Sequence, residues 1–302
     1  MLFDYHIHPD FSPDAQGSIT DYCRQALAIG VKELCFTTHY EPDPVRAEIE
    51  RIIVRGEARA VDSDWTSAYL EEIERAQRAF PELDIRAGIE IGYEMGLEGR
   101  IADFLSQNRF DFVLGAVHCL DHISITSKGE IDEFRFQLKP RGSEFIAKRY
   151  FEYVRAAAGS GLFDCLAHLD IWRKCILPEM GTGFLDAIGQ FIEPMVSAIA
   201  HSRTGLEINT SAFRRGDDEP YPQEEIVRLA VQRGVRIFTI GSDCHRVSDL
   251  GSGIKRGMEV LLKLGLEPAR FQNRQMISGG QLKLRNCEGW LFPAHWKRYK
   301  FS

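Results

Sequence analysis

Long hydrophobic runs are absent from this 302-residue sequence, in which no stretch approaches the roughly 20 consecutive apolar residues that cross a membrane. The first fifteen residues are largely polar and hold no apolar secretion segment, so we expect no signal peptide. Basic charge is also scarce, since 37 Lys and Arg oppose 44 Asp and Glu and the net charge is -7. This balance disfavours binding to a nucleic-acid backbone. We therefore expect a cytoplasmic protein without membrane or nucleic-acid partners, and the sequence leaves its oligomeric state open.

The seven cysteines include no Cys-x-x-Cys pair, and their odd number does not suit a complete set of disulfides. Several lie in apolar, strand-like segments such as residues 163–167. We expect reduced, mostly buried thiols. Cys119 and Cys244 lie next to candidate metal ligands but are not counted among them.

Strand-like apolar runs alternate with amphipathic helical segments along the chain. The predicted strands cover 2–8, 33–38, 84–90, 110–118, 163–168, 205–209 and 236–243, and the predicted helices cover 18–29, 65–80, 142–158, 184–201, 223–233 and 253–264. This alternation is typical of parallel βαβ units, and runs without polar alternation suit strands buried on both faces. We expect one α/β domain over residues 1–302. Within this domain we expect two charged loop insertions, near 40–63 and 120–141. The domain ends in an aromatic tail at 289–302.

Nearly every predicted strand ends in a residue that can bind a metal. His6 and His8 are one residue apart, so their imidazoles project from the same face of a strand and can bind one divalent cation. Asp243 and His245 repeat this spacing at the last strand. The other candidates are His39, Glu90, His118, His168 and, in the loop after the first strand, Asp14. Because the carboxyl ends of barrel strands meet at one rim, we expect these side chains to converge there.

The alternative is that the nine histidines are ordinary surface or core residues. Six of the nine fall at strand ends, which chance placement does not favour. Of the remaining three, His201 and His295 are interpreted as structural, whereas His122 follows the His118 motif and is a candidate for substrate contact.

Imidazole and carboxylate ligands without a thiolate cluster suit Zn²⁺, Mn²⁺ or Fe²⁺. Six histidines together with Asp14, Glu90 and Asp243 exceed the needs of one ion. They fit two or three divalent ions if one carboxylate bridges. Adjacent metal ions suit phosphoester hydrolysis, because they stabilise both the attacking and the leaving oxygen.

The ordered set His-x-His, Thr-Thr-His39, Gly-Ile-Glu90, Ala-Val-His118, Ala-His168-Leu-Asp, Glu-Ile-Asn-Thr and Gly-Ser-Asp243-Cys-His245 resembles the PHP (polymerase and histidinol phosphatase) family. The resemblance runs from residue 2 to about residue 250, and the sequence is most similar to the histidinol-phosphate phosphatases of that family. It implies a distorted (β/α)7 TIM-like barrel with three metal sites. The implied ligand sets are His6, His8, Glu90 and Asp243; Glu90, His118 and His168; and Asp14, His39 and His245. Asp10 competes with Asp14 for its place.

The resemblance also implies how a phosphomonoester would be hydrolysed. A hydroxide bridging two metals attacks phosphorus, and the catalytic groups are Asp14, Glu90, Asp243 and His245, with the proton donor to the leaving group left open. We expect Arg214 and Arg173 to bind phosphate, with Arg141 and Lys174 as further options. Glu207 and Asn209 are expected to orient ligands.

Histidinol-phosphate hydrolysis, a step of histidine biosynthesis, is the first function that this resemblance implies, with a small phosphorylated substrate and inorganic phosphate as product. Another small phosphate ester or a nucleotide is the alternative substrate within the family. A polymerase-associated module is disfavoured because nothing polymerase-like follows residue 250. A metal-dependent amidohydrolase also begins with His-x-His on a barrel and remains open.

Overall fold

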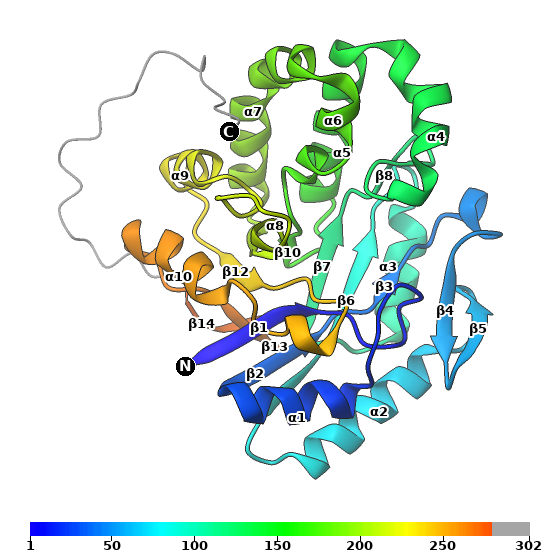
Figure 1. Cartoon of the computed structure of the whole chain (residues 1–302), viewed down its shortest axis with the longest axis vertical. Coiled ribbons are helices and arrows are strands. Elements are labelled where there is room, and N and C mark those ends of the chain that lie inside the picture. The colour runs from blue at the N-terminus through cyan, green and yellow to red at the C-terminus, as the bar shows by residue number, and fades with distance from the viewer. Residues whose placement is uncertain (280–302) are drawn as a thin grey trace.

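The computed structural model describes residues 1–279. Seven parallel strands form one continuous sheet (Figure 1). Their order is β1 (Leu2–Ile7), β2 (Val31–Phe36), β6 (Asp84–Gly92), β7 (Phe112–Ala116), β10 (Cys165–Leu166), β11 (Gly205–Asn209) and β12 (Phe238–Gly241), and the short β3 (His39–Tyr40) also pairs with β6. The sequence therefore predicted the fold class correctly, with observed strands that are mostly shorter than the predicted ones.

The sheet curls until its last strand meets its first. His8 donates a backbone hydrogen bond to the carbonyl oxygen of Cys244 at 3.0 Å, and Cys244 donates to that of His6 at 3.4 Å. The buried Asp4 accepts backbone hydrogen bonds from Ser242 and Gly251 across the same seam. The resulting barrel is nearly closed, and the seam holds the His6–His8 segment beside the segment that carries Asp243.

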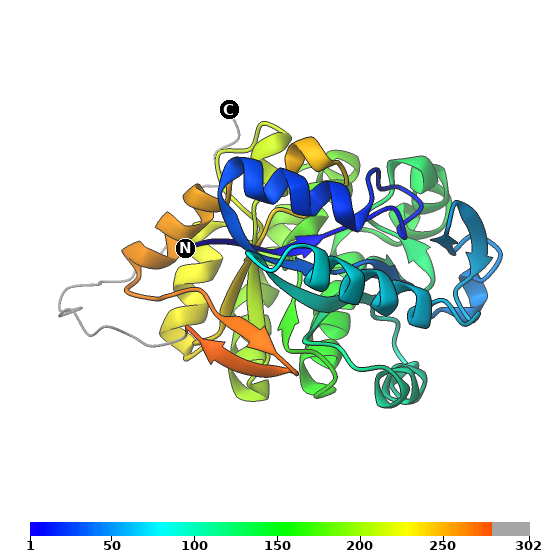
Figure 2. The ribbon, with the colours of Figure 1, turned by 90° about the horizontal axis from the view of Figure 1, so that it is seen from below.

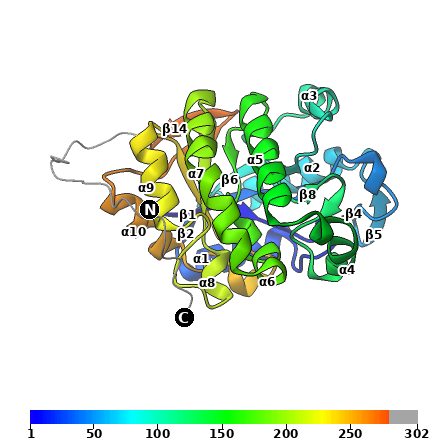
Figure 3. The ribbon, with the colours of Figure 1, turned by 90° about the horizontal axis from the view of Figure 1, so that it is seen from above.

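One helix follows each strand and covers the outside of the barrel (Figures 1 and 3). The helices are α1 (Ile19–Ile29), α2 (Thr66–Ala79), α3 (Glu98–Gln107), α5 (Ser143–Gly159), α7 (Thr182–Ser202), α9 (Glu224–Arg233) and α10 (Ile254–Lys263). The sequence did not predict α3. Only Ile101 of this ten-residue helix is buried and no side chain caps its N-terminus, so its helical signal is weak.

The two predicted insertions fold into short elements near the carboxyl ends of the strands. The first contains the antiparallel hairpin β4 (Arg51–Val54) and β5 (Glu57–Ala60). The second contains β9 (Ile123–Ser124), which pairs with β8 (Cys119–Leu120), and α4 (Ile131–Glu133). Two further short helices, α6 (Ile176–Met180) and α8 (Ser211–Arg214), follow β10 and β11. These segments surround the rim on which the candidate ligands lie.

A third antiparallel pair, β13 (Arg270–Gln272) and β14 (Gln275–Ser278), forms a hairpin that closes the opposite end of the barrel (Figure 2). Phe271 packs against Phe112 inside the barrel with ring centroids 5.1 Å apart, and Arg270 pairs with the buried Glu33 at 2.8 Å. Within residues 1–279, the hairpin therefore fills this end of the barrel interior, and the candidate ligands lie at the opposite, carboxyl-terminal rim.

The six described cysteines are free and buried, as expected, whereas Cys287 and the aromatic tail at 289–302 lie outside the described residues. Within residues 1–279, no helix combines the length and the apolar character that crossing a membrane requires.

Candidate metal centre

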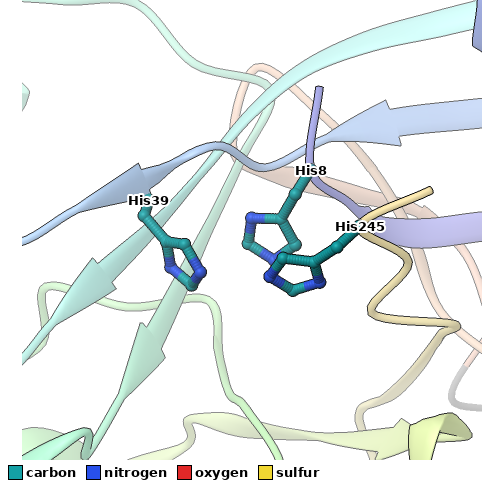
Figure 4. Close-up of side chains that lie close together, drawn as sticks. All are labelled: His8, His39 and His245. Atoms are coloured by element: carbon teal, nitrogen blue, oxygen red, sulfur yellow. The ribbon is translucent and has the colours of Figure 1, made fainter. Parts of the chain in front are cut away.

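The nine candidate ligands lie together at the carboxyl-terminal rim of the barrel. Figure 4 shows His8, His39 and His245 pointing toward one another, although they come from the end of β1, from β3 and from the loop after β12, with His8 directly following the last residue of β1. The His8 ring centroid lies 4.1 Å from that of His39 and 4.2 Å from that of His245. Residues 237 positions apart in the chain therefore share one small volume.

Glu90 lies at the middle of the cluster and is fully buried. Its two carboxylate oxygens face different histidines. Oε2 lies 2.9 Å from His39 Nδ1, 3.3 Å from His6 Nε2 and 3.5 Å from His8 Nε2, and Oε1 lies 3.1 Å from His168 Nε2 and 3.4 Å from His118 Nε2. A carboxylate with a separate set of imidazoles on each oxygen has the arrangement of a bridging ligand.

Asp243 and Asp14 complete the cluster on the side of β12. Asp243 Oδ1 lies 3.5 Å from His8 Nε2 and 3.6 Å from His245 Nδ1. Asp14 Oδ2 lies 3.3 Å from His245 Nε2, and its side chain is 63% exposed at the rim. Asp10 is instead close to the negative charges of Glu72 and Asp21, which add to the effect of burial in raising its pKa. The geometry therefore brings Asp14, and not Asp10, to the other candidates.

Unsatisfied buried atoms mark the centre of this cluster. Nε2 of His6 and of His8, Nδ1 of His39 and Oε2 of Glu90 are all buried without a hydrogen-bond partner. Leaving such atoms unpaired is costly, and a divalent cation would satisfy them together. Three groups of side chains have ligand atoms within 4.8 Å of one another: His6, His8 and Glu90; His39, Glu90 and His118; and His8, His39 and His245.

The electrostatics of the cluster also suit cations. Burial alone would lower the pKa of His6, but the carboxylates of Glu207, Glu90 and Asp243 raise it well above its ordinary value. Burial opposes charge on Glu90, yet the imidazoles of His6, His118 and His39 hold its pKa well below the usual range. At His8, burial and the neighbouring imidazoles of His39 and His245 instead lower the pKa well below its ordinary value. Ionised carboxylates and imidazoles in one buried cluster are a donor set that fits divalent metal ions.

Two further carboxylates orient the histidines. Glu207 Oε1 lies 2.6 Å from His6 Nδ1, a contact that suits the orienting role expected of Glu207, and its Oε2 accepts from the backbone of His168 at 3.1 Å. Glu41 Oε1 lies 2.6 Å from His118 Nδ1. Since a carboxylate only accepts, each Nδ1 carries the proton and each Nε2 lone pair faces the cluster. Sequence reasoning missed Glu41, although its spacing of two from His39 on β3 repeats the His6–His8 pattern.

A cavity of about 540 Å³ opens over the cluster. One wall comes from the two insertions and carries three carboxylates and three cations: Glu41, Glu50, Glu130, Arg46, Arg51 and Lys128. The Arg46 guanidinium pairs with Glu50 at 2.7 Å and with Glu130 at 2.9 Å. The other wall comes from the loops after β10 and β11 and carries Lys174 and Arg215. The cavity therefore has one side of mixed charge and one basic side.

The expected phosphate ligands Arg173 and Arg214 do not line this cavity. Arg173 is directed into the body, where it pairs with Asp217 at 3.0 Å, donates to the carbonyl oxygen of Pro220 at 2.8 Å and stacks on Tyr221. Arg214 donates to backbone carbonyl oxygens after β12.

In both loops the residue that follows the expected arginine, Lys174 or Arg215, faces the cavity instead. Placement in a loop was predictable, but the direction of each side chain depends on the short helical turn that carries it. Arg141, a further option, pairs with Asp121 at 3.5 Å and does not line the cavity.

His122 lies outside the cavity lining as well. Its Nδ1 is 2.7 Å from Asp43 Oδ2, and its backbone donates to Glu94 at 3.2 Å. The three side chains form a separate group with ligand atoms within 4.8 Å of one another, but these hydrogen bonds already connect them. The structure thus gives His122 a role in the insertion loops and no contact with the main cluster.

Comparison with known proteins agrees with this architecture. The model of the PHP domain matches residues 4–211. A probable histidinol-phosphatase from Deinococcus radiodurans is 28% identical over 281 residues, covering 91% of this chain and 98% of the relative. The histidinol-phosphatase of Lactococcus lactis is 24% identical over 280 residues.

Two solved structures share the fold over nearly their whole length. Histidinol phosphate phosphatase from Lactococcus lactis, in complex with zinc, L-histidinol and phosphate, superposes with a TM-score of 0.74 at 22% identity and covers 92% of this chain. A putative histidinol phosphatase from Listeria monocytogenes has a TM-score of 0.70 at 22% identity and covers 84% of it.

Proposed function

Because the chain belongs to the PHP domain family, we propose that it is a metal-dependent phosphatase that hydrolyses histidinol phosphate to histidinol and inorganic phosphate. The observation that carries this proposal is the Glu90 cluster, in which imidazoles surround both oxygens of one buried carboxylate. Relatives named histidinol-phosphatase, aligned over about nine-tenths of the chain, support the choice of substrate.

The cluster would hold two or three divalent ions. His6, His8, Glu90 and Asp243 are the proposed ligands of one site; Glu90, His118 and His168 those of a second; and Asp14, His39 and His245 those of a third. Bound ions of this kind supply positive charge for the phosphoryl oxygens and activate water as a nucleophile. The relative from Lactococcus lactis, which was solved with zinc, favours that metal.

The protein's own groups have separate tasks in this proposal. Glu207 and Glu41 keep the Nε2 lone pairs of His6 and His118 directed at the centre. Lys174 and Arg215 would bind the phosphate dianion from the basic wall, since neither side chain has a carboxylate partner among the described residues. Burial and the neighbouring Arg215 guanidinium lower the pKa of the Lys174 ammonium, which makes an anionic partner favourable there.

The carboxylates of the insertion wall account for the other end of the substrate. Histidinol carries an ammonium group and an imidazole, both of which can be cationic. Glu50 and Glu130 face the cavity among the cations of the same wall, and their carboxylates are the groups that would bind a cationic tail. A phosphate ester with such a tail would therefore match both walls. We also propose the cytoplasm as its location, as for other soluble biosynthetic enzymes.

The test is metal analysis of the purified protein combined with turnover on histidinol phosphate and on uncharged-tail phosphomonoesters such as glycerol phosphate. We expect two or three equivalents of Zn, Mn or Fe and a strong preference for histidinol phosphate in kcat/KM. Glu50→Gln should reduce that preference while leaving the metal content unchanged. Absence of metal, or equal turnover of all the esters, would contradict the proposal.

A further inference from the structure

Asp243 has an unusual backbone conformation for a residue with a side chain. Its φ is +53°, in the left-handed region that residues other than glycine adopt at a cost in free energy. Such conformations persist only where neighbouring groups hold them. Neighbouring contacts must therefore keep Asp243 in this conformation, in which its carboxylate faces His6 and His8.

Arg214 makes those contacts. From α8 it reaches the loop after β12, where Nη1 donates to the carbonyl oxygen of Ser242 at 2.7 Å and Nη2 donates to that of Asp243 at 2.8 Å. The two carbonyl groups belong to the two peptide planes that flank the Asp243 Cα, so bonds to both restrain the φ and ψ angles of Asp243. On the other side, Asn209 donates to Asp243 Oδ2 at 3.3 Å, so the backbone and the carboxylate are both held.

We propose that Arg214 is a positioning residue that maintains the strained backbone of Asp243 and thereby the metal affinity of the cluster. The inference rests on the metal centre proposed above. It also assigns different tasks to two adjacent arginines. Arg214 is committed to carbonyl groups, with Asp249 as a more distant partner at 3.7 Å, whereas Arg215 faces the cavity and its phosphate-binding side.

The experiment compares Arg214→Met, Arg215→Met and Arg236→Met in the full-length protein. Arg236 is the matched control, because it also donates to two backbone carbonyl oxygens, those of Val231 at 2.7 Å and of Val235 at 3.0 Å, but it is exposed and does not line the cavity. Three quantities are measured for each variant: bound zinc after equilibration with a competing chelator, kcat and KM for histidinol phosphate at saturating metal, and inhibition by inorganic phosphate.

Arg214→Met should lower zinc affinity about 10- to 100-fold, as for other groups that orient metal ligands, while KM and phosphate inhibition at saturating metal stay near the values of the unaltered protein. Arg215→Met should show the reverse, with unchanged zinc retention and weaker phosphate inhibition. Arg236→Met should change none of these quantities. Unchanged zinc affinity in Arg214→Met, or weakened phosphate inhibition in that variant, would overturn the inference.

Arg214→Lys tests the same idea if the methionine variant does not fold. Its ammonium can reach only one of the two carbonyl oxygens, so zinc affinity should fall by less than in Arg214→Met but phosphate inhibition should not change. If Arg214→Lys keeps the full zinc affinity, the positioning role is wrong. If the unaltered protein itself binds no zinc, manganese or iron, the proposed metal centre fails first, which is a different result.

Discussion

Gly92 leaves room for the side chain of Glu41, the carboxylate that the sequence did not predict as a site residue. A Cβ atom at this site at the end of β6 would overlap the Glu41 side chain, which lies against His118. Gly92→Ala should therefore displace Glu41 and release the Nδ1 proton of His118 from its acceptor. We expect a loss of about 10- to 100-fold in metal affinity or activity, measured by chelator competition and turnover.

Gly99 provides the control for this substitution. It lies in α3 with open space around its Cα, so Gly99→Ala should leave metal binding unchanged and should stabilise the helix by about 0.5–1 kcal/mol. If Gly92→Ala binds metal as tightly as Gly99→Ala does, then Glu41 does not support His118.

Residue type and strand position together predicted which side chains would come together. His6, His8, Glu90 and Asp243 each end or follow an apolar strand, and parallel strands in a barrel bring such ends to one rim. The basic residues were less predictable. Lys174 and Arg215 lie in or beside single helical turns, where a shift of one residue rotates a side chain by about 100°, and the sequence does not fix that rotation.

At the scale of single elements, the hairpin β13–β14 depends on one aromatic anchor. Phe271 is buried against Phe112 and its backbone donates to the hydroxyl of Tyr5 at 2.8 Å. Phe271→Ala should lower the free energy of unfolding by about 3–5 kcal/mol, because it leaves a cavity at the closed end of the barrel. Thermal and denaturant unfolding measure this loss.

Met276 of β14 is the matched control, since its side chain is 45% exposed and pairs with Phe271 across the hairpin. Met276→Ala should change stability by about 0.5 kcal/mol or less. Turnover per bound metal should be unaffected in both variants, because the hairpin lies at the end of the barrel opposite the cluster. A large loss of stability in Met276→Ala, with none in Phe271→Ala, would mean that the hairpin is held in another way.

At the scale of the whole molecule, the barrel could be predicted because the strand-like runs and the helical periodicity of the sequence indicate the same fold. Six of the seven outer helices and all seven barrel strands follow from hydrophobic periodicity, and β10 is the element with the largest discrepancy. Only Cys165 and Leu166 of its predicted six residues pair as a strand, since the chain turns at His168, where φ is +28°. Such a turn depends on the acceptor Glu207, which is distant in sequence, so periodicity alone does not reveal it.

Metal ions should link the parts of this barrel and raise its stability as a whole. The proposed ligands come from six strands or the loops that follow them, and the ions can bind this arrangement only in the folded chain. A ligand at 100 times its dissociation constant stabilises a fold by about 2.7 kcal/mol for each site. Chelation should therefore lower the Tm by several degrees, and added Zn²⁺, Mn²⁺ or Fe²⁺ should restore it, as followed by calorimetry with metal analysis of the same samples.

The Asp243→Asn variant makes this prediction specific to the cluster. Losing one carboxylate ligand should reduce both the bound metal and the Tm difference between the metal-loaded and chelated forms. Acidification should have the same effect as the chelator, because imidazole binds a metal only when it is neutral and protons compete for each histidine as the pH falls. At His6, whose pKa the neighbouring carboxylates raise, this competition should begin above the ordinary imidazole pKa of about 6.5. A Tm difference that is the same in Asp243→Asn and in the unaltered protein would place the stabilising ions elsewhere.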